Sequence, residues 1–212
     1  TLQRQVYVSD RVKTMNESIY YNIDALHNAI SEGVQITFHY FEWVLDFSAQ
    51  ERICKRYRKD GALYQVSPWA LTWDDENYYM IAYDAASNDI RHYRVDKMEH
   101  ISLTDARREG QQMFHHQFNV AAYSRKVFGM FSGEEKTVRL RCENRFIGVI
   151  RDRFGSDIMV QKLDDAHFAV NVSVAVSPQF FSWVFGLGGA VQIIEPDDVC
   201  ISFRQQLQDM LK

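Results

Sequence analysis

Apolar residues recur at helical spacing near the start of the chain. Ile19, Ile23, Leu26 and Ile30 are spaced so that their side chains share one face of a helix. Gly33 follows this stretch, and glycine is the residue that most often ends a helix. The pattern therefore predicts an amphipathic helix that ends at Gly33.

Between residues 34 and 104 the pattern changes to short β-rich runs separated by polar turns. We expect strands at residues 34–44, 51–58, 62–73, 77–84, 89–95 and 98–104. No long helical pattern interrupts them. Short consecutive strands favour a small closed or half-closed β-barrel, because closure removes exposed sheet edges.

The second half of the chain alternates strands and helices. Asn119 is a predicted cap for a short helix, and the polar segment 132–135 is the predicted domain boundary. Beyond it we expect a strand at 137–142, a helix at 144–154, a hairpin of 157–163 and 167–176, a helix from Pro178 to Phe185, a strand at 191–194 and a helix after Pro196. This β-α-β-β-α-β order is that of the split βαβ, or ferredoxin-like, arrangement.

Composition narrows the class of protein. Apolar residues make up 46% of the chain and charged residues 25%, which predicts folded globular domains. The net charge is -4, so a polyanion would need a local basic patch. Three scattered cysteines, without zinc-ligand spacing, predict reduced thiols and no metal. No apolar run approaches the roughly 20 residues of a membrane span, so we expect a cytoplasmic protein.

One stretch carries a recognisable signature. Residues 64–98 contain Val66-Ser67-Pro68, then Tyr78-Tyr79-Met80 followed by Ile81-Ala82-Tyr83, then Arg91-His92-Tyr93-Arg94-Val95-Asp96-Lys97-Met98. This stretch resembles the WYL domain of bacterial transcriptional regulators. The name triplet keeps only Tyr79, since Tyr78 and Met80 stand where the family has Trp and Leu. Residues 136–212 resemble the extension that commonly follows this domain, so the resemblance covers nearly the whole chain.

The resemblance implies an α+β protein with a defined order of domains. Residues 17–105 would form the WYL domain, an Sm-like, SH3-type β-barrel with a leading helix. Residues 106–135 would be a bridge, and 136–212 a ferredoxin-like extension that helps to form a homodimer. Residues 1–16 would be a linker from a DNA-binding winged helix-turn-helix. The WYL domain would bind a nucleic-acid fragment or nucleotide as effector and thereby control DNA binding.

Cations next to aromatic residues are the candidate effector contacts. Arginine binds phosphate through a planar fork, and bases stack on aromatic rings. The predicted ligand-binding residues are Ser67, Tyr79, Arg91, His92, Tyr93, Arg94 and Lys97. On a regular strand His92 and Arg94 share one face, while Arg91 and Tyr93 share the other. The alternative is that Arg91 and Lys97 are solvated and that Arg94 pairs with Asp96 or another acid.

A second basic group offers a phosphate track. Its residues are Arg52, Lys55, Arg56 and Arg58. The alternative is a solvated hairpin whose charges only favour solubility.

No motif indicates catalysis. The sequence holds no nucleophile with a base at a recognised spacing, so we expect no enzyme and no cofactor. The alternative function is a direct single-stranded nucleic-acid-binding module. That function requires exposed aromatic residues on the last domain's sheet. The candidate positions are aliphatic, which counts against it: Val138, Leu140, Val172, Val174 and Val176. Turnover of a bound nucleotide without added metal would instead indicate a hydrolase.

Overall fold

The computed structural model describes residues 18–114 and 118–212, which form two compact α+β units. The first unit holds the described residues up to Leu71 together with Asn77–Gln111. The second holds Thr72–Glu76 and the described residues from Gln112 to Lys212. The predicted linker 1–16 lies outside the described residues.

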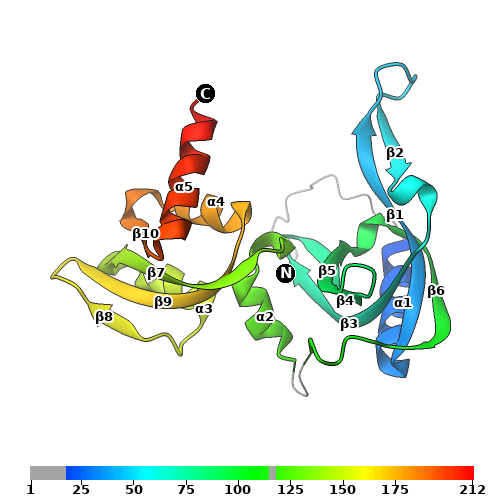
Figure 1. Ribbon diagram of the computed structural model, residues 1–212, viewed down its shortest axis with the longest axis horizontal. Helices are drawn as coiled ribbons and strands as arrows, with labels where there is room; N and C mark the ends of the chain where they lie inside the picture. Colours follow the sequence, from blue (N-terminus) through cyan, green and yellow to red (C-terminus); the bar gives the residue numbers. More distant parts are fainter. Residues whose placement is uncertain (1–17, 115–117) are drawn as a thin grey trace, which may run out of the picture. The chain divides into compact units, whose positions relative to one another are not determined.

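The first unit consists of a helix and a curled antiparallel sheet (Figure 1). Its elements are α1 (Ser18–Glu32), β1 (Val34–Leu45), β2 (Ile53–Tyr57), β3 (Tyr64–Asp74), β4 (Asn77–Asp84), β5 (Asp89–Arg94) and β6 (Met98–Arg107). The strand order is β2-β1-β3-β4-β5, and β6 also pairs with β1. All the strands that the sequence predicts are present, and Gly33 ends α1 with a φ of 67°.

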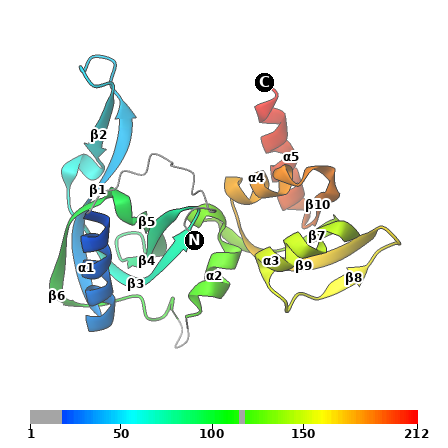
Figure 2. The ribbon, with the colours of Figure 1, turned by 180° about the vertical axis from the view of Figure 1, so that it is seen from behind.

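The apolar face of α1 packs against this sheet, as the spacing of its apolar residues predicts (Figure 2). Leu26 and Ala29 are fully buried beside Phe38 of β1 and Met80 of β4. A polar contact adds to this packing, because the Asn22 side chain donates to the backbone carbonyls at positions 95 and 98. The helix therefore fixes the turn that follows β5.

Strands β1 and β2 extend beyond the sheet as a two-stranded ribbon (Figure 1). The register places Glu42 opposite Arg56 and Trp43 opposite Lys55. Directly opposed residues share one face of an antiparallel pair. Glu42 and Arg56 therefore lie on one face of the ribbon, and Trp43 and Lys55 on the other.

The second unit has a four-stranded antiparallel sheet and four helices within its described residues. Its elements are α2 (Val120–Lys126), β7 (Glu134–Glu143), α3 (Ile147–Phe154), β8 (Val160–Lys162), β9 (His167–Val176), α4 (Pro178–Gly186), β10 (Val191–Glu195) and α5 (Asp197–Met210). The order from β7 to β10 is the order that the sequence predicts. Some boundaries differ. β7 begins at Glu134, inside the predicted polar break, because its first residues pair with the end of β9. α3 begins later than predicted, after a 3-10 turn at Asn144–Phe146, and β8 is shorter than the predicted strand 157–163.

Local signals explain where these helices begin and end. The Asn119 side chain accepts a hydrogen bond from the Ala122 amide, and Ser177 accepts one from the Phe180 amide. Both are N-cap contacts that satisfy amides left free at a helix start. Gly155 ends α3 with a φ of 97° and donates to the Arg151 carbonyl.

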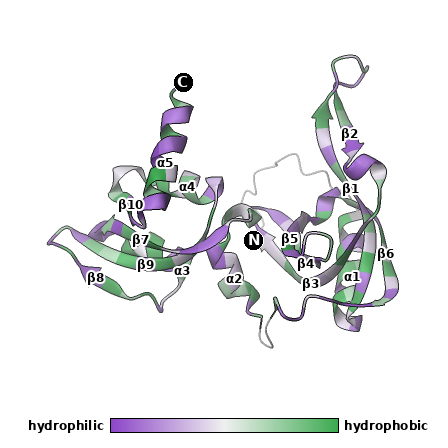
Figure 3. Cartoon of the chain, viewed as in Figure 1, coloured by the Kyte–Doolittle hydropathy of each residue, from purple (hydrophilic) through white to green (hydrophobic). Residues whose placement is uncertain are grey.

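Helices α3, α4 and α5 all pack on one face of the second sheet. Ile150 of α3, Phe180 of α4 and Val199 of α5 share a core with β7 and β9. Hydrophobic and hydrophilic bands alternate along α5, as its one-sided packing requires (Figure 3). The aliphatic sheet residues that count against a nucleic-acid-binding module lie in this core or pack against it: Val138, Leu140, Val172, Val174 and Val176. None of the helices in the described part of the chain is long and apolar enough to cross a membrane.

Candidate anion-binding site

Two of the predicted ligand residues lie in the interior of the first unit. Tyr93 is 6% exposed, and its ring packs edge-on against Phe38 and Tyr40 at centroid distances of 5.2 and 5.4 Å. Burial raises the pKa of the Tyr93 hydroxyl. Ser67 is 2% exposed, and its hydroxyl accepts a hydrogen bond from the Glu109 amide. Both residues are therefore buried within the first unit, and a role for them in ligand binding stays a prediction.

The alternation along β5 otherwise follows the prediction. Arg91 is exposed, and its guanidinium contacts the Ser87 hydroxyl at 3.2 Å. His92 and Arg94 are partly buried on the opposite face from Tyr93. Tyr79 of β4 lies directly across from Arg94 in the register. Tyr79, His92 and Arg94 therefore share one face of the β4–β5 pair, without a bulge.

Arg94 forms the ion pair that the alternative interpretation predicts. Its Nε and Nη2 donate to the two carboxylate oxygens of Asp96 at 3.0 and 2.8 Å. Its backbone amide donates to the Tyr40 hydroxyl at 3.1 Å. The Asp96 hydrogen bonds raise the pKa of the Arg94 guanidinium. The Arg94 and Asp96 side chains remain 34% and 28% exposed, so the donors that Asp96 does not use can reach a ligand.

The two basic groups that the sequence separates meet in the first unit. Lys97 follows β5 in the short turn Val95–Lys97. Burial lowers the pKa of its ammonium group most, and the positive charges of Arg94 and Arg58 lower it further. The carboxylates of Asp96 and Glu42 act in the opposite direction. Arg58 follows β2, and its amide donates to the Tyr40 carbonyl at 2.8 Å, so this end of the predicted phosphate track lies close to the β5 signature.

Glu42 organises the β2 side of this cluster. Its carboxylate lies 2.7 Å from Arg56 and 3.8 Å from Arg58, and these cations lower the pKa of the acid, mainly through the Arg56 hydrogen bond. A hollow opens here, lined by Glu42, Arg56, Tyr57, Arg58, Lys59, Asp60 and Gly61. Glu42 is not among the residues that the sequence predicts for this site. The signal for it was the hairpin register, which brings an acid on β1 opposite an arginine on β2.

Positive charge exceeds negative charge in this region, which we call the basic cluster. Its cations are Arg56, Arg58, Lys59, Arg94 and Lys97, and its acids are Glu42, Asp60 and Asp96. Excess cations on a partly buried surface attract anions, because the surface screens their charge less than bulk water does. The cluster suits phosphate or carboxylate groups.

The other two residues of the predicted track lie away from the basic cluster. Lys55 is on the opposite face of the ribbon from Arg56, pairs with Glu99 at 2.7 Å and sits 4.4 Å above the Phe41 ring. Arg52 lies 5.9 Å from the Phe47 ring centroid. The ribbon therefore does not present the four basic residues as one track.

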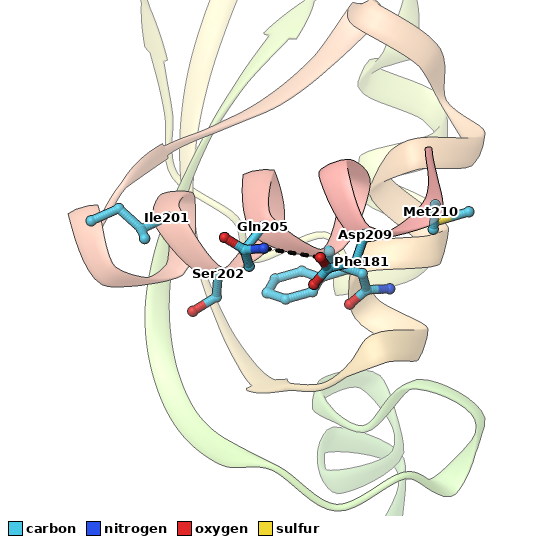
Figure 4. A pocket seen from close by; sticks show the side chains of 7 residues that line it. Phe181, Ile201, Ser202, Gln205, Asp209 and Met210 are labelled. Atoms are coloured by element: carbon cyan, nitrogen blue, oxygen red, sulfur yellow. Dashed lines mark hydrogen bonds between the residues drawn. The ribbon is translucent and has the colours of Figure 1, made fainter. Parts of the chain in front are cut away.

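A hollow in the second unit has different chemistry (Figure 4). Its lining is Phe181 of α4 and Ile201, Ser202, Gln205, Gln206, Asp209 and Met210 of α5. Gln205 donates to the Asp209 carboxylate at 3.1 Å, so these polar groups satisfy one another. The lining contains one carboxylate and no cation, which disfavours an anionic ligand.

Two family models match the chain. The model described as the WYL domain matches residues 21–103, and the WCX domain matches residues 134–211. No curated protein matches the chain.

Two solved structures resemble the chain at low sequence identity. One is of proteasome accessory factor B/C (PafBC) of Arthrobacter aurescens, at 19% identity and a TM-score of 0.36, covering 95% of this chain and 28% of that one. The other is a CRISPR Cas-related protein, at 13% identity and a TM-score of 0.49, covering 91% of this chain and 52% of that one. This chain therefore spans about half or less of the length of either.

Proposed function

Because the chain belongs to the WYL-domain family and carries a WCX domain after its WYL domain, we propose that it is the ligand-sensing region of a transcriptional regulator. The effector is a nucleic-acid fragment or a nucleotide, and it binds the basic cluster of the first unit. The observation that carries this proposal is that Tyr40 contacts both basic segments: its backbone carbonyl accepts from the Arg58 amide at 2.8 Å, and its hydroxyl accepts from the Arg94 amide at 3.1 Å.

The proposed binding mode follows from the groups available. Arg94 keeps its Asp96 partner and offers its remaining N–H donors to a phosphate oxygen. Lys97 and Arg58 add positive charge to the same cluster. Tyr79, across from Arg94, is the aromatic residue closest in register to receive a base. The ligand is recognised by its phosphate first and its base second.

The same proposal includes the fold type of each domain, an N-terminal DNA-binding domain and a homodimer. The curled sheet with its leading helix supports an Sm-like barrel, and the strand order β10-β7-β9-β8 supports a ferredoxin-like WCX domain. By family resemblance, an N-terminal winged helix-turn-helix contacts DNA, and the second domain forms a homodimer. The region senses a ligand and does not catalyse a reaction.

Fluorescence anisotropy tests the effector site. Labelled single-stranded DNA and RNA oligomers are titrated and competed with mononucleotides and cyclic dinucleotides, using the parent and Arg94→Ala. Loss of a charge-assisted contact costs about 1.5–3 kcal/mol, so binding weakens more than tenfold. Arg145→Ala is the matched control, because Arg145 is an exposed arginine of the other unit that pairs with Glu143. Equal binding by Arg94→Ala and the parent would contradict the site.

A further inference from the structure

The second unit has a sheet face that helices α3, α4 and α5 do not cover. Side chains alternate across a strand, so the residues of β7 between Val138, Leu140 and Cys142 point away from the core. Two of these residues are arginines, Arg139 and Arg141. They are neighbours on the face opposite α3, α4 and α5, roughly 6–7 Å apart along the strand.

Neutral side chains from the flanking strands hold both guanidinium groups. Arg139 donates to Gln161 of β8 at 2.6 Å. Arg141 lies 3.4 Å from the amide oxygen of Gln192 on β10 and 3.0 Å from Nε2 of His167 on β9. Since arginine only donates, His167 Nε2 accepts, and its Nδ1 proton then points to Asp164.

No carboxylate neutralises these two arginines at ion-pair distance within the described residues. Glu195 lies across from Arg139 in the register, after a bulge, but forms no ion pair with it. Glu135, further along β7, is already bound by Lys126 and Ser173. Both arginines therefore keep donors that no carboxylate binds directly, and Glu195 is the nearest acid in the register.

The rest of this face is polar and holds three acids. Glu135 and Glu143 are paired with Lys126 and Arg145, and the exposed Glu195 forms no ion pair within the described residues. Asn171 and Thr137 are exposed beside the arginines, and Ala169 leaves space between Arg141 and Gln161. No aromatic ring other than the His167 imidazole lies among these residues. The face can therefore bind anionic groups and hydrogen-bonding edges, but it offers no platform for base stacking.

We propose that this open face, centred on Arg139 and Arg141, is a second anion-binding surface that takes the sugar–phosphate backbone of a single-stranded nucleic acid. The arginine forks bind successive phosphates, and the amides of Gln161 and Asn171 form hydrogen bonds with sugar and base edges. A carboxylate partner would use the arginines alone, whereas this mixture of donors and acceptors suits a nucleotide chain. The surface does not depend on the effector site of the first unit.

Salt dependence provides the test. Binding of a labelled oligo-dT and of an abasic strand of equal length is measured by anisotropy across a salt series, with the whole chain. Each single-strand phosphate contact contributes about 0.7 to the slope of log K against log salt. Arg139→Gln/Arg141→Gln therefore lowers the slope by about 1.4 and weakens binding at least about tenfold at low salt. The change is equal for both strands, because no base stacks here.

Two control variants distinguish binding at this surface from a general loss of charge and from misfolding. Arg145→Gln/Lys162→Gln removes the same charge from the same unit, but from cations that pair with Glu143 and Asp165, and it leaves the slope nearly unchanged. Arg139→Lys/Arg141→Lys keeps the charge and guards against misfolding. It retains the slope while losing affinity, because lysine lacks the fork.

A variant that lacks the effector site separates this surface from the proposed site of the first unit. In Arg94→Gln/Lys97→Gln the effector site is disabled, and the slope change from Arg139→Gln/Arg141→Gln persists. If that change is absent, or if it equals the change from the Arg145→Gln/Lys162→Gln control, the surface is not a nucleic-acid site. A polyglutamate peptide that binds through Arg139 and Arg141 more tightly than the oligomer would also overturn the proposal, in favour of an acidic protein partner.

Discussion

The ion pair between Arg94 and Asp96 separates a binding role for Arg94 from a purely structural one. Asp96→Asn keeps the shape of the side chain and one acceptor for Arg94, but removes the negative charge that lies 2.8 Å from the guanidinium. Both side chains are about one-third exposed. Solvent therefore weakens the pair, and its loss costs at most about 1 kcal/mol of folding stability.

Asp96→Asn lowers folding stability but strengthens ligand binding. A phosphate on the remaining donors of Arg94 would sit about 4–5 Å from the Asp96 carboxylate, where like charges repel by about 1 kcal/mol in a water-like medium. Removing the carboxylate strengthens binding by that amount, which is about fivefold in Kd. Titration of a labelled oligomer or of a mononucleotide at low salt measures it.

The control for this prediction is Asp165→Asn, which removes one negative charge from an exposed pair with Lys162 in the other unit. It leaves binding unchanged. If Asp96→Asn binds no better than the parent while retaining its thermal stability, Arg94 does not contact the ligand. The alternative that Arg94 is fully occupied by Asp96 would then hold.

Three further predictions concern the fold. Gly110→Ala destabilises the first unit by at least about 2 kcal/mol, because φ is +86° and a Cβ would strike the Tyr83 ring; an unchanged denaturation midpoint would contradict this. Ser177→Ala costs about 1 kcal/mol by removing the α4 cap, whereas Ser177→Asp restores it in the same urea titration. Hydrogen bonds from Lys55, and then from Tyr57, lower the pKa of the Glu99 carboxyl in the folded protein. The ionised carboxylate therefore adds to folding stability above its unfolded pKa of about 4.3, and this stability is lost as pH falls through the lower folded pKa. Glu99→Gln is therefore less stable at pH 7 by up to about 1 kcal/mol, and urea titrations of variant and parent converge at pH 3; a constant difference would refute the linkage.

Local signals in the sequence were sufficient for most of the fold. Asn119 and Ser177 make the cap contacts expected of them, and Gly33 ends α1. Each signal acts within a few residues, so it can be read without knowing the tertiary structure. The start of β7 at Glu134 could not be read this way, since pairing with β9 imposes it on polar residues.

The candidate site was predicted only in part, for a related reason. Alternation separates His92 and Arg94 from Arg91 and Tyr93, but it does not say which face meets the core. Packing against Phe38 buries Tyr93. Alternation alone also could not bury Ser67, which is held by Glu109, a residue distant in sequence.

The sequence could not predict that the basic residues after β2 lie close to those of β5. This proximity depends on the register of β1 with β2 and of β4 with β5, which are non-local pairings. The sequence alone treated Arg58 and Arg94 as members of separate sites. The sequence also did not predict the open face of the second sheet. The aliphatic residues of β7 mark the buried face, and the arginines between them carry no local signal of a binding surface.

A double-mutant cycle on Arg58 and Lys97 tests most directly whether the two basic groups form one binding site. Oligomer affinity is measured for the parent, Arg58→Gln, Lys97→Gln and the double variant, with Arg58→Gln and Arg145→Gln as the control cycle. Residues of one site are non-additive, so we expect a coupling of at least about 0.5 kcal/mol for Arg58 with Lys97 and none for the control. Additive losses in both cycles, or no loss at all, would contradict a single effector site in the first unit.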